Sequence, residues 1–227
     1  YTREEKFQIA KHHLLPKQMK RHGLTASKAR VADDALYALI DNYTREAGVR
    51  SLEREVASLL RKSAKQIVAG ESKKVVITDE NITDYLGPRK MRPEQIQPYD
   101  EVGMVNGLAW TSVGGEMLQV EVAVLDGSGK IELTGSLGDV MKESARAAVS
   151  FIRAHWEAYG IEHDFYKTKD IHIHVPEGAV PKDGPSAGVT ITTALVSALS
   201  DTPVHRDVAM TGEVTLRGRV LAIGGLK

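Results

Sequence analysis

The sequence of 227 residues contains no cysteine. Disulfide bonds and thiolate metal sites are therefore excluded, and this absence fits a protein of the cytoplasm. The sequence also has no apolar run of membrane-spanning length, and its first residues do not form a signal peptide. We therefore expect a cytoplasmic chain with no membrane partner.

Aromatic residues make up only 5% of the sequence, and the formal net charge is zero. The charge is unevenly divided, because residues 1–90 hold 18 Lys and Arg against 12 Asp and Glu, whereas residues 91–227 hold 12 against 18. This asymmetry favours two unlike modules. The basic half offers no aromatic platform for bases, so we expect nucleic-acid binding to be weak or absent.

The first part of the chain has helical periodicity. Apolar residues at Leu52, Val56, Leu59 and Leu60 follow the spacing of an amphipathic helix, and Gly70 is a helix-stop signal. The segments that we predict as helices are 4–13, 16–22, 31–43, 49–68 and 79–86, with a short strand over 74–78. Together they predict a small helical bundle over residues 1–88.

Residues 89–102 are predicted to be a linker, because the segment around them is rich in proline and charge and lacks periodicity. Beyond it, residues 103–227 are predicted to form a mixed domain, which makes the fold class of the chain α+β. Its predicted strands are 104–112, 117–125, 130–134 and 170–176, the first three joined as hairpins across glycine turns. Its predicted helices are 139–159 and 186–199, followed by a hairpin near 207–223.

The segment 181–188, Pro-Lys-Asp-Gly-Pro-Ser-Ala-Gly, joins the predicted strand 170–176 to the helix 186–199. It places Ser186 at a helix start, where backbone N–H groups favour negative charge and small neighbours leave the hydroxyl accessible. That position suits a nucleophile whose attack creates an oxyanion. An alternative is that Asp183 or Ser186 is simply the helix N-cap.

A serine nucleophile needs a base, and the residues offer more than one candidate. His172 and His174 lie at alternate positions of one strand and share a face, so a Ser/His/Asp triad with Asp183 is one hypothesis. A two-histidine metal site is another, but no third ligand is suitably spaced, and we expect no metal. The simplest interpretation is a polar strand face near a rim or interface.

The serine segment and its flanking blocks resemble the proteolytic domain of the Lon family of ATP-dependent proteases. The similarity extends in register over essentially the whole chain. The blocks that carry it are 13–18, 43–54, 106–111, 135–141, 170–179, 181–188, 209–218 and 223–227.

The resemblance implies that Ser186 is the nucleophile of a Ser–Lys dyad in which no histidine takes part. The family block reads Gly-Gly-hydrophobic-Lys-Glu-Lys, and its second lysine is the base. Lys227 matches the first lysine, so we expect the base to lie beyond Lys227 and the isolated chain to be inactive. A catalytically inactive fragment that acts only in assembly or docking, and a Ser/His hydrolase, are the alternatives.

The same resemblance assigns supporting residues. Thr211 corresponds to the threonine that hydrogen-bonds the catalytic lysine, and Asp183 to an acidic residue at the rim of the active site. For Trp110, Glu121 and Glu213, packing or a surface role is the expected assignment.

Residues Gly48-Val49-Arg50 resemble the sensor-2 motif in the small α-domain of AAA+ ATPases, in which the arginine reaches the phosphates of ATP. The sequence contains no Gly-x-x-x-x-Gly-Lys-Ser/Thr loop. ATP with Mg is therefore expected as a cofactor of the full-length enzyme only, bound through a nucleotide core outside these residues.

The resemblance further implies a parent enzyme that is a cytosolic homohexamer. It would unfold proteins with ATP and cut them by an acyl-enzyme mechanism. Its expected substrates are unfolded, damaged or short-lived regulatory proteins.

Overall fold

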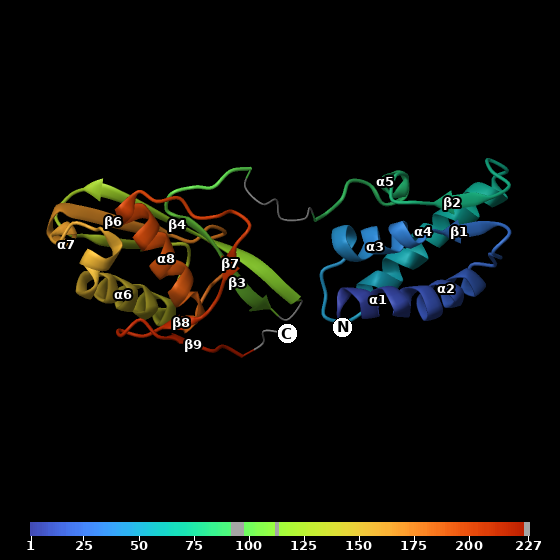
Figure 1. Cartoon of the computed structure of the whole chain (residues 1–227). Helices are drawn as coiled ribbons and strands as arrows, with labels where there is room; N and C mark the ends of the chain where they lie inside the picture. Colours follow the sequence, from blue (N-terminus) through green and yellow to red (C-terminus); the bar gives the residue numbers. More distant parts are fainter. Residues whose placement is uncertain (92–97, 112–113, 225–227) are drawn as a thin grey trace. The chain divides into compact units, whose positions relative to one another are not determined.

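The computed structural model describes residues 1–91, 98–111 and 114–224. They fall into two compact units, the first formed mainly by residues 1–91 and the second mainly by residues 98–111 and 115–224 (Figure 1). The first unit is helical and the second is a mixed α/β unit, so the predicted fold class is confirmed. Among the described residues, no helix is both long enough and apolar enough to cross a membrane.

The first unit packs helices around one long amphipathic helix, with a small parallel sheet beside them. Helix α1 (Arg3–Ile9) begins with a capping box in which the Glu5 N–H donates to Thr2 Oγ1 and the Thr2 N–H donates to Glu5 Oε2. The other elements are the π-helical segment η1 (Ala10–Leu14), α2 (Leu15–Arg21), β1 (Ala29–Val31), α3 (Asp33–Ala38), the π-helical segment η2 (Leu39–Tyr43), α4 (Arg50–Val68), β2 (Val75–Ile77) and α5 (Ile82–Leu86).

Helix α4 forms the centre of this unit. Its side chains Leu52, Val56, Leu59 and Leu60 are fully buried, at the spacing that the sequence predicted. The helix predicted over 31–43 was wrong at its start, because residues 29–31 form β1, which pairs in parallel with β2. A three-residue strand has too few positions for its alternation to stand out within a helical pattern.

The second unit is a five-stranded mixed sheet with helices packed against it (Figure 1). Its strands are β3 (Met104–Thr111), β4 (Gly114–Asp126), β5 (Ile131–Thr134), β6 (Lys169–His174) and β7 (Ala209–Met210), in the spatial order β5-β6-β4-β3-β7. The other elements are α6 (Asp139–Ala154), the 3₁₀ segment η3 (Trp156–Tyr159), α7 (Phe165–Thr168), the 3₁₀ segment η4 (Pro185–Ala187), α8 (Gly188–Ser200), β8 (Glu213–Val214) and β9 (Val220–Leu221).

The core of the second unit lies between the sheet and the paired helices α6 and α8. Ile173 of β6 is fully buried, as are Ile191 and Leu195 of α8 and Ile152 of α6. The inward face of β6 therefore continues through Ile171 and Ile173, and its alternate residues point to the other face of the sheet. Helices α6 and α8 lie side by side (Figure 1).

One predicted hairpin was wrong, and another is present but shorter than predicted. Strands β4 and β5 are not neighbours, because β6 lies between them, antiparallel to β4 and parallel to β5. The hairpin predicted near 207–223 is shorter, since β7 joins the main sheet beside β3 and only β8 and β9 pair as a hairpin. Both differences come from strand pairings between residues distant in the sequence, which local turn signals do not report.

Candidate active site

Ser186 lies in the 3₁₀ turn η4, immediately before α8. Gly184 precedes the turn with φ 137°, a conformation that residues with a side chain rarely adopt. Helix α8 begins at Gly188 rather than at Ser186, and its N-cap position is Ala187, which makes no side-chain cap. The interpretation of Ser186 or Asp183 as the N-cap of this helix is therefore wrong, and the Ser186 side chain is not used as a cap.

The backbone carbonyl of Ser186 is held by the segment that follows β7. The Gly212 N–H donates to it at 2.7 Å, and the Thr211 hydroxyl donates to it at 3.2 Å. The Gly212 carbonyl in turn accepts from the Val189 N–H of α8 at 2.9 Å. These bonds fix the serine turn against residues 211–212 and bring Thr211, a predicted site residue, beside Ser186.

The packing around Gly188 shows how closely the segment after β7 approaches the start of α8. A Cβ atom at Gly188 would meet the Val214 backbone nitrogen at 2.8 Å and the Ser144 hydroxyl at 3.0 Å. Glycine is thus required by a close backbone approach, even though the helical conformation of Gly188 suits any residue. The tight packing keeps the turn that carries Ser186 in one place.

On its other side, the serine segment is bound to the start of α6 by Asp183. Asp183 Oδ1 accepts from the Met141 N–H and from the Gly184 N–H, both at 3.0 Å. Met141 is the third residue of α6, so the carboxylate satisfies one of the free donors at that helix end. Asp183 therefore caps α6 rather than the helix that follows it in the sequence.

The backbone beside Asp183 adds two hydrogen bonds to the same contact. The Lys182 N–H donates to the Ser136 carbonyl at 3.0 Å, and the Gly138 N–H donates to the Lys182 carbonyl at 2.7 Å. A Cβ atom at Gly138 would lie 2.2 Å from Asp183 Cγ, so the carboxylate occupies space that only glycine leaves open. The serine turn is consequently held from two directions.

The histidine candidates lie on the other face of the sheet. Ile171 and Ile173 point into the core against α8, so the alternation of β6 directs His172 and His174 away from the side on which Ser186 precedes α8. Both rings contact Thr134 Oγ1, at 2.8 Å from His172 Nε2 and 2.6 Å from His174 Nδ1. The structure does not bring these histidines together with Ser186.

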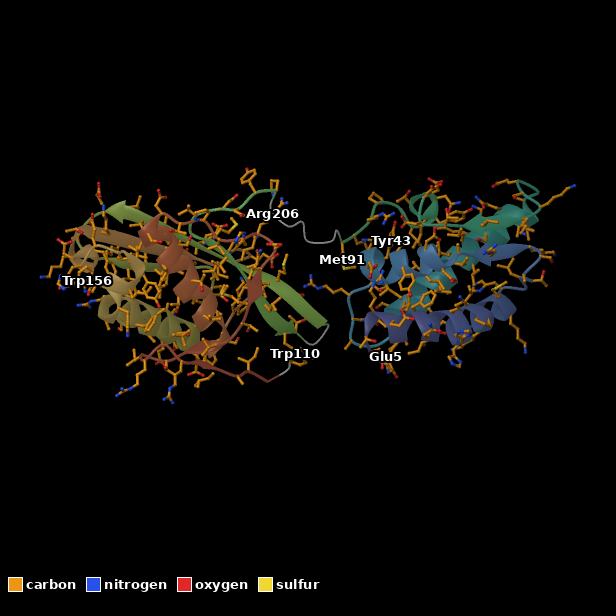
Figure 2. The ribbon with its side chains drawn as sticks, viewed as in Figure 1. Glu5, Tyr43, Met91, Trp110, Trp156 and Arg206 are labelled. Atoms are coloured by element: carbon orange, nitrogen blue, oxygen red, sulfur yellow. The ribbon has the colours of Figure 1, made fainter. Side chains whose placement is uncertain are left out.

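The described residues contain no group of three or more His, Cys, Asp or Glu side chains that could hold a metal ion. Trp110, labelled in Figure 2, is 73% exposed and lies at the surface of the second unit. Lys227, the residue that matches the first lysine of the family block, lies outside the described residues, as do residues 92–97 of the predicted linker.

Comparison with known proteins connects this site to a family. A profile described as the Lon protease (S16) C-terminal proteolytic domain matches residues 76–227, and one described as the Lon protease AAA+ ATPase lid domain matches residues 20–76. The chain belongs to the Lon protease family. Lon proteases are serine peptidases, and the second unit carries most of the match to their proteolytic domain.

The whole chain aligns with curated Lon proteases. It is 59% identical over 227 residues to the Lon protease of Finegoldia magna and to Lon protease 1 of Bacillus subtilis, and 56% identical to the Lon protease of Brucella abortus. These alignments cover all of this chain but only 28–29% of each relative. The chain therefore spans less than a third of the length of the Lon proteases that it matches.

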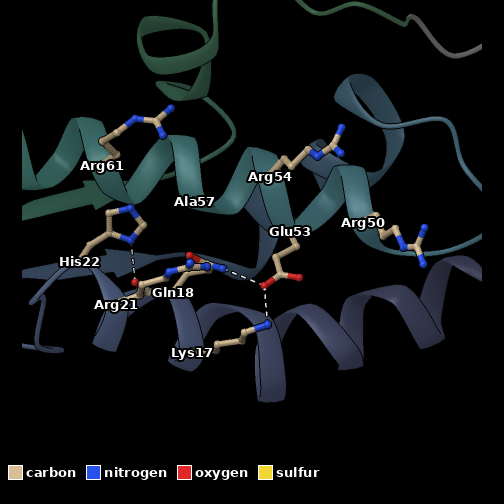
Figure 3. A pocket seen from close by; sticks show the side chains of 9 residues that line it. All are labelled: Lys17, Gln18, Arg21, His22, Arg50, Glu53, Arg54, Ala57 and Arg61. Carbon is tan, nitrogen blue, oxygen red and sulfur yellow. Dashed lines mark hydrogen bonds and ion pairs between the residues drawn. The ribbon is translucent and has the colours of Figure 1, made fainter.

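The segment of this Lon family member that matches the lid domain contains Arg50, the residue predicted to contact the phosphates of ATP. It is the first residue of α4, and the helix end beside it is capped by Glu46, whose carboxylate accepts from the Ser51 and Leu52 N–H groups at 2.9 and 2.8 Å. Because the Glu46 carboxylate already accepts from these N–H groups, an anion near Arg50 would be bound by the guanidinium rather than by the helix end. Arg50 lines a groove with other basic residues (Figure 3).

The sequence located Ser186 and its neighbours Thr211 and Asp183, but not the contacts that hold them. Gly212, which donates to the Ser186 carbonyl, and Gly138, which leaves room for Asp183, were missed. Their position in the sequence could have identified both glycines, because Gly212 follows Thr211 directly and Gly138 lies in the block 135–141 that resembles the family.

Proposed function

We propose that this chain is the part of an ATP-dependent Lon-type endopeptidase that contains the serine of a Ser–Lys dyad. The observation that carries the proposal is the fixation of Ser186 by Thr211 and Gly212 on one side and by Asp183 on the other. A nucleophile gains from such fixed geometry because the reacting atom is positioned before the substrate arrives.

In the proposed reaction, Ser186 Oγ attacks the carbonyl carbon of a peptide bond while a neutral lysine accepts the hydroxyl proton. Backbone N–H groups near the serine stabilise the oxyanion, the leaving amine takes a proton, and water then hydrolyses the acyl-enzyme. A lysine in an apolar, desolvated site has a lowered pKa and can act as this base. The second lysine of the family block has no counterpart among residues 1–227.

We further propose that Arg50 contacts ATP in the full-length protein. When it is bound with Mg, ATP would supply the free energy for unfolding substrates. Arg50 fits the role chemically, because a guanidinium at the groove surface can donate two parallel hydrogen bonds to a phosphate. Residues 1–227 contain no glycine-rich phosphate loop, so a nucleotide core elsewhere in the protein would hold most of the ligand.

The remaining features of the proposal concern the whole enzyme. Its substrates would be unfolded, damaged or short-lived regulatory proteins, its assembly a homohexamer, and its compartment the cytoplasm. Within this chain we propose a helical domain over 1–88, a linker over 89–102 and a peptidase domain over 103–227. The positions of His172 and His174 on the opposite sheet face speak against the alternative of a Ser/His hydrolase.

The experiment is a peptidase assay on a fluorogenic unstructured peptide. Residues 1–227 alone are expected to show no turnover, and a longer chain that includes the second lysine is expected to be active. Ser186→Ala should abolish that activity, while the double variant His172→Ala/His174→Ala should retain it. Turnover that persists without Ser186, or that requires either histidine, would contradict the proposed mechanism.

A further inference from the structure

Residues 87–91, with which the described part of the first unit ends, form neither helix nor strand, yet they are bound to the helices beside them. We call them the exit segment, because the chain continues from Met91, labelled in Figure 2, to the second unit. The residue that anchors this segment is Asn42, in the π-helical segment η2, and it is only 5% exposed. A buried amide requires hydrogen-bond partners, and the exit segment supplies them.

Among the described residues, four hydrogen bonds join Asn42 to the exit segment. Its backbone carbonyl accepts from the Lys90 and Met91 N–H groups, both at 3.0 Å. Its side chain donates from Nδ2 to the Met91 carbonyl at 3.1 Å and accepts at Oδ1 from Arg89 Nη1 at 2.6 Å. Carbonyls in the last turn of a helix have no partner within the helix, so the exit segment satisfies one that would otherwise be free.

Other contacts hold the same segment along its length. The Arg89 guanidinium also donates to Asp79 Oδ1 at 2.7 Å. The hydroxyl of Tyr43, a buried residue next to Asn42, donates to the Gly87 carbonyl at 2.8 Å. The exit segment is therefore bound to η2 at its first residue and at its last.

The helical segment that anchors the exit segment leads directly to Arg50. The Thr44 hydroxyl closes the end of η2 by donating to the Leu39 carbonyl at 3.1 Å. The Glu46 carboxylate then caps α4, whose first residue is Arg50. Asn42 therefore lies, along a hydrogen-bonded stretch of chain, between the residue proposed to contact ATP and the segment that continues to the second unit.

The chain is also held where the description of the second unit begins. Asp100 Oδ1 accepts from the Arg206 N–H at 3.0 Å, and Asp100 Oδ2 lies 3.2 Å from His205 Nδ1. The Val204 N–H donates to the Glu101 carbonyl at 3.0 Å. The connection between the units is thus attached by hydrogen bonds to each unit.

We propose that Asn42 is a positioning residue that couples Arg50 to the peptidase unit by keeping the exit segment docked. The proposal rests on the ATP-dependent function proposed above. Undocking would release the five residues 87–91, and an extended chain spans about 3.4 Å per residue, so the connection would gain about 17 Å of slack. Movement of the first unit would then be taken up by this slack instead of being passed to the second unit.

The test uses the full-length protein and measures turnover of a fluorogenic unstructured peptide with and without ATP. Asn42→Ala removes two side-chain hydrogen bonds, one of them from a charged group, which should shift docking toward the undocked state about tenfold. The ratio of turnover with ATP to turnover without ATP should fall toward one. Turnover without ATP and the rate of ATP hydrolysis should stay as in the parent. Arg89→Gln, at a partly exposed position, should lower the ratio in the same direction.

Asn81→Ala is the matched control. The Asn81 side chain also makes one donated and one accepted hydrogen bond in the first unit, to the Val76 carbonyl and from the Thr78 N–H, both at 2.9 Å, but neither involves the exit segment. This variant should lose stability and keep the parent's ratio. Hydrogen exchange of residues 1–227 gives a direct readout, since the Lys90 and Met91 amides should exchange about tenfold faster in Asn42→Ala and unchanged in Asn81→Ala.

The outcomes separate this inference from the proposed function. If ATP stimulates the parent and both Asn42→Ala and Arg89→Gln keep the full stimulation, the coupling role falls while the ATP-dependent function stands. An equal fall of the ratio in Asn81→Ala, or a loss of turnover without ATP in Asn42→Ala, would also overturn the coupling role, because a general loss of stability would then explain the result. A parent with the same turnover with and without ATP would refute the ATP-dependent function and the coupling together.

Discussion

Replacing Asp183 by alanine tests whether its carboxylate holds the serine segment against α6. The change removes the acceptor for the Met141 and Gly184 N–H groups, each 3.0 Å from Asp183 Oδ1. Loss of a helix cap costs about 0.5–2 kcal/mol, and the Asp183 side chain is accessible to solvent, so we expect a loss of about 1 kcal/mol in the free energy of unfolding. Asp183→Asn keeps an acceptor and should lose only the charge–dipole contribution, about 0.3 kcal/mol for an exposed carboxylate that solvent and salt screen.

The measurement can be confined to the second unit. The chain has two tryptophans, Trp110 and Trp156, and both belong to that unit. Urea unfolding followed by tryptophan fluorescence therefore reports its stability separately from the helical unit. Hydrogen exchange at the Met141 amide gives a local readout, and a loss of about 1 kcal/mol corresponds to roughly fivefold faster exchange if α6 opens with the unit.

The activity of Asp183 variants gives a second readout in a longer chain that includes the second lysine. Asp183→Ala should lower turnover of an unstructured peptide, because the carboxylate also fixes Gly184, two residues before Ser186. Asp183→Asn should retain most of it. If the asparagine variant lost as much stability and activity as the alanine variant, the hydrogen-bond argument would be refuted and the negative charge itself would be responsible. An alanine variant identical to the parent would refute the capping role altogether.

Two further substitutions test other contacts of the second unit. Thr211→Val removes the hydroxyl that donates to the Ser186 carbonyl at 3.2 Å. Turnover in the longer chain should therefore fall, and the second unit should lose about 0.5–1.5 kcal/mol of its free energy of unfolding. Unchanged peptidase kinetics would contradict this prediction. Asp170→Asn weakens the turn in which Asp170 accepts from the Ser128 and Lys130 N–H groups at 2.8 Å. These bonds, first that from Ser128, lower the pKa of Asp170 below its unfolded value, about 3.9, so its stabilisation is present above that pH and lost as the pH falls through the folded pKa. The Asp170→Asn variant should therefore be less stable than the parent at pH 7, and the difference in the free energy of unfolding should shrink near pH 3. Urea unfolding followed by fluorescence measures both. An equal difference at the two pH values would rule out this account.

Local patterns were sufficient for the elements whose stabilising contacts recur along one helix face. The helix predicted over 49–68 is α4, Arg50–Val68, because Leu52, Val56 and Leu59 fall on one face at helical spacing. The serine segment was also found from the sequence alone, since its small residues, its proline and its resemblance to a known family occupy one short stretch. Thr211 was also singled out from the sequence, as the threonine that hydrogen-bonds the catalytic lysine, and in the structure its hydroxyl donates to the Ser186 carbonyl.

Pairings between distant segments were not accessible in this way. Strands β4 and β5 were predicted as a hairpin, but β6 begins 35 residues after the end of β5 and inserts between them. A turn signal reports that the chain reverses direction, but not which strand will lie beside it once the sheet is complete. Side-chain hydrogen bonds between distant residues were equally inaccessible. The Asp183 carboxylate accepts from the N–H of Met141, 42 residues earlier, and does not cap the helix that it precedes.

The sequence by itself determined the family, the position of the candidate serine and the course of the long helix, because each depends on residues that are close together in the chain. Only the tertiary structure decided that the histidines face away from Ser186, that Asp183 caps α6 and that arginines from two helices line one groove. The physical reason is the range of the interactions. Helix periodicity and turn chemistry act within a few residues, whereas sheet order and helix packing place side chains together that the sequence separates widely.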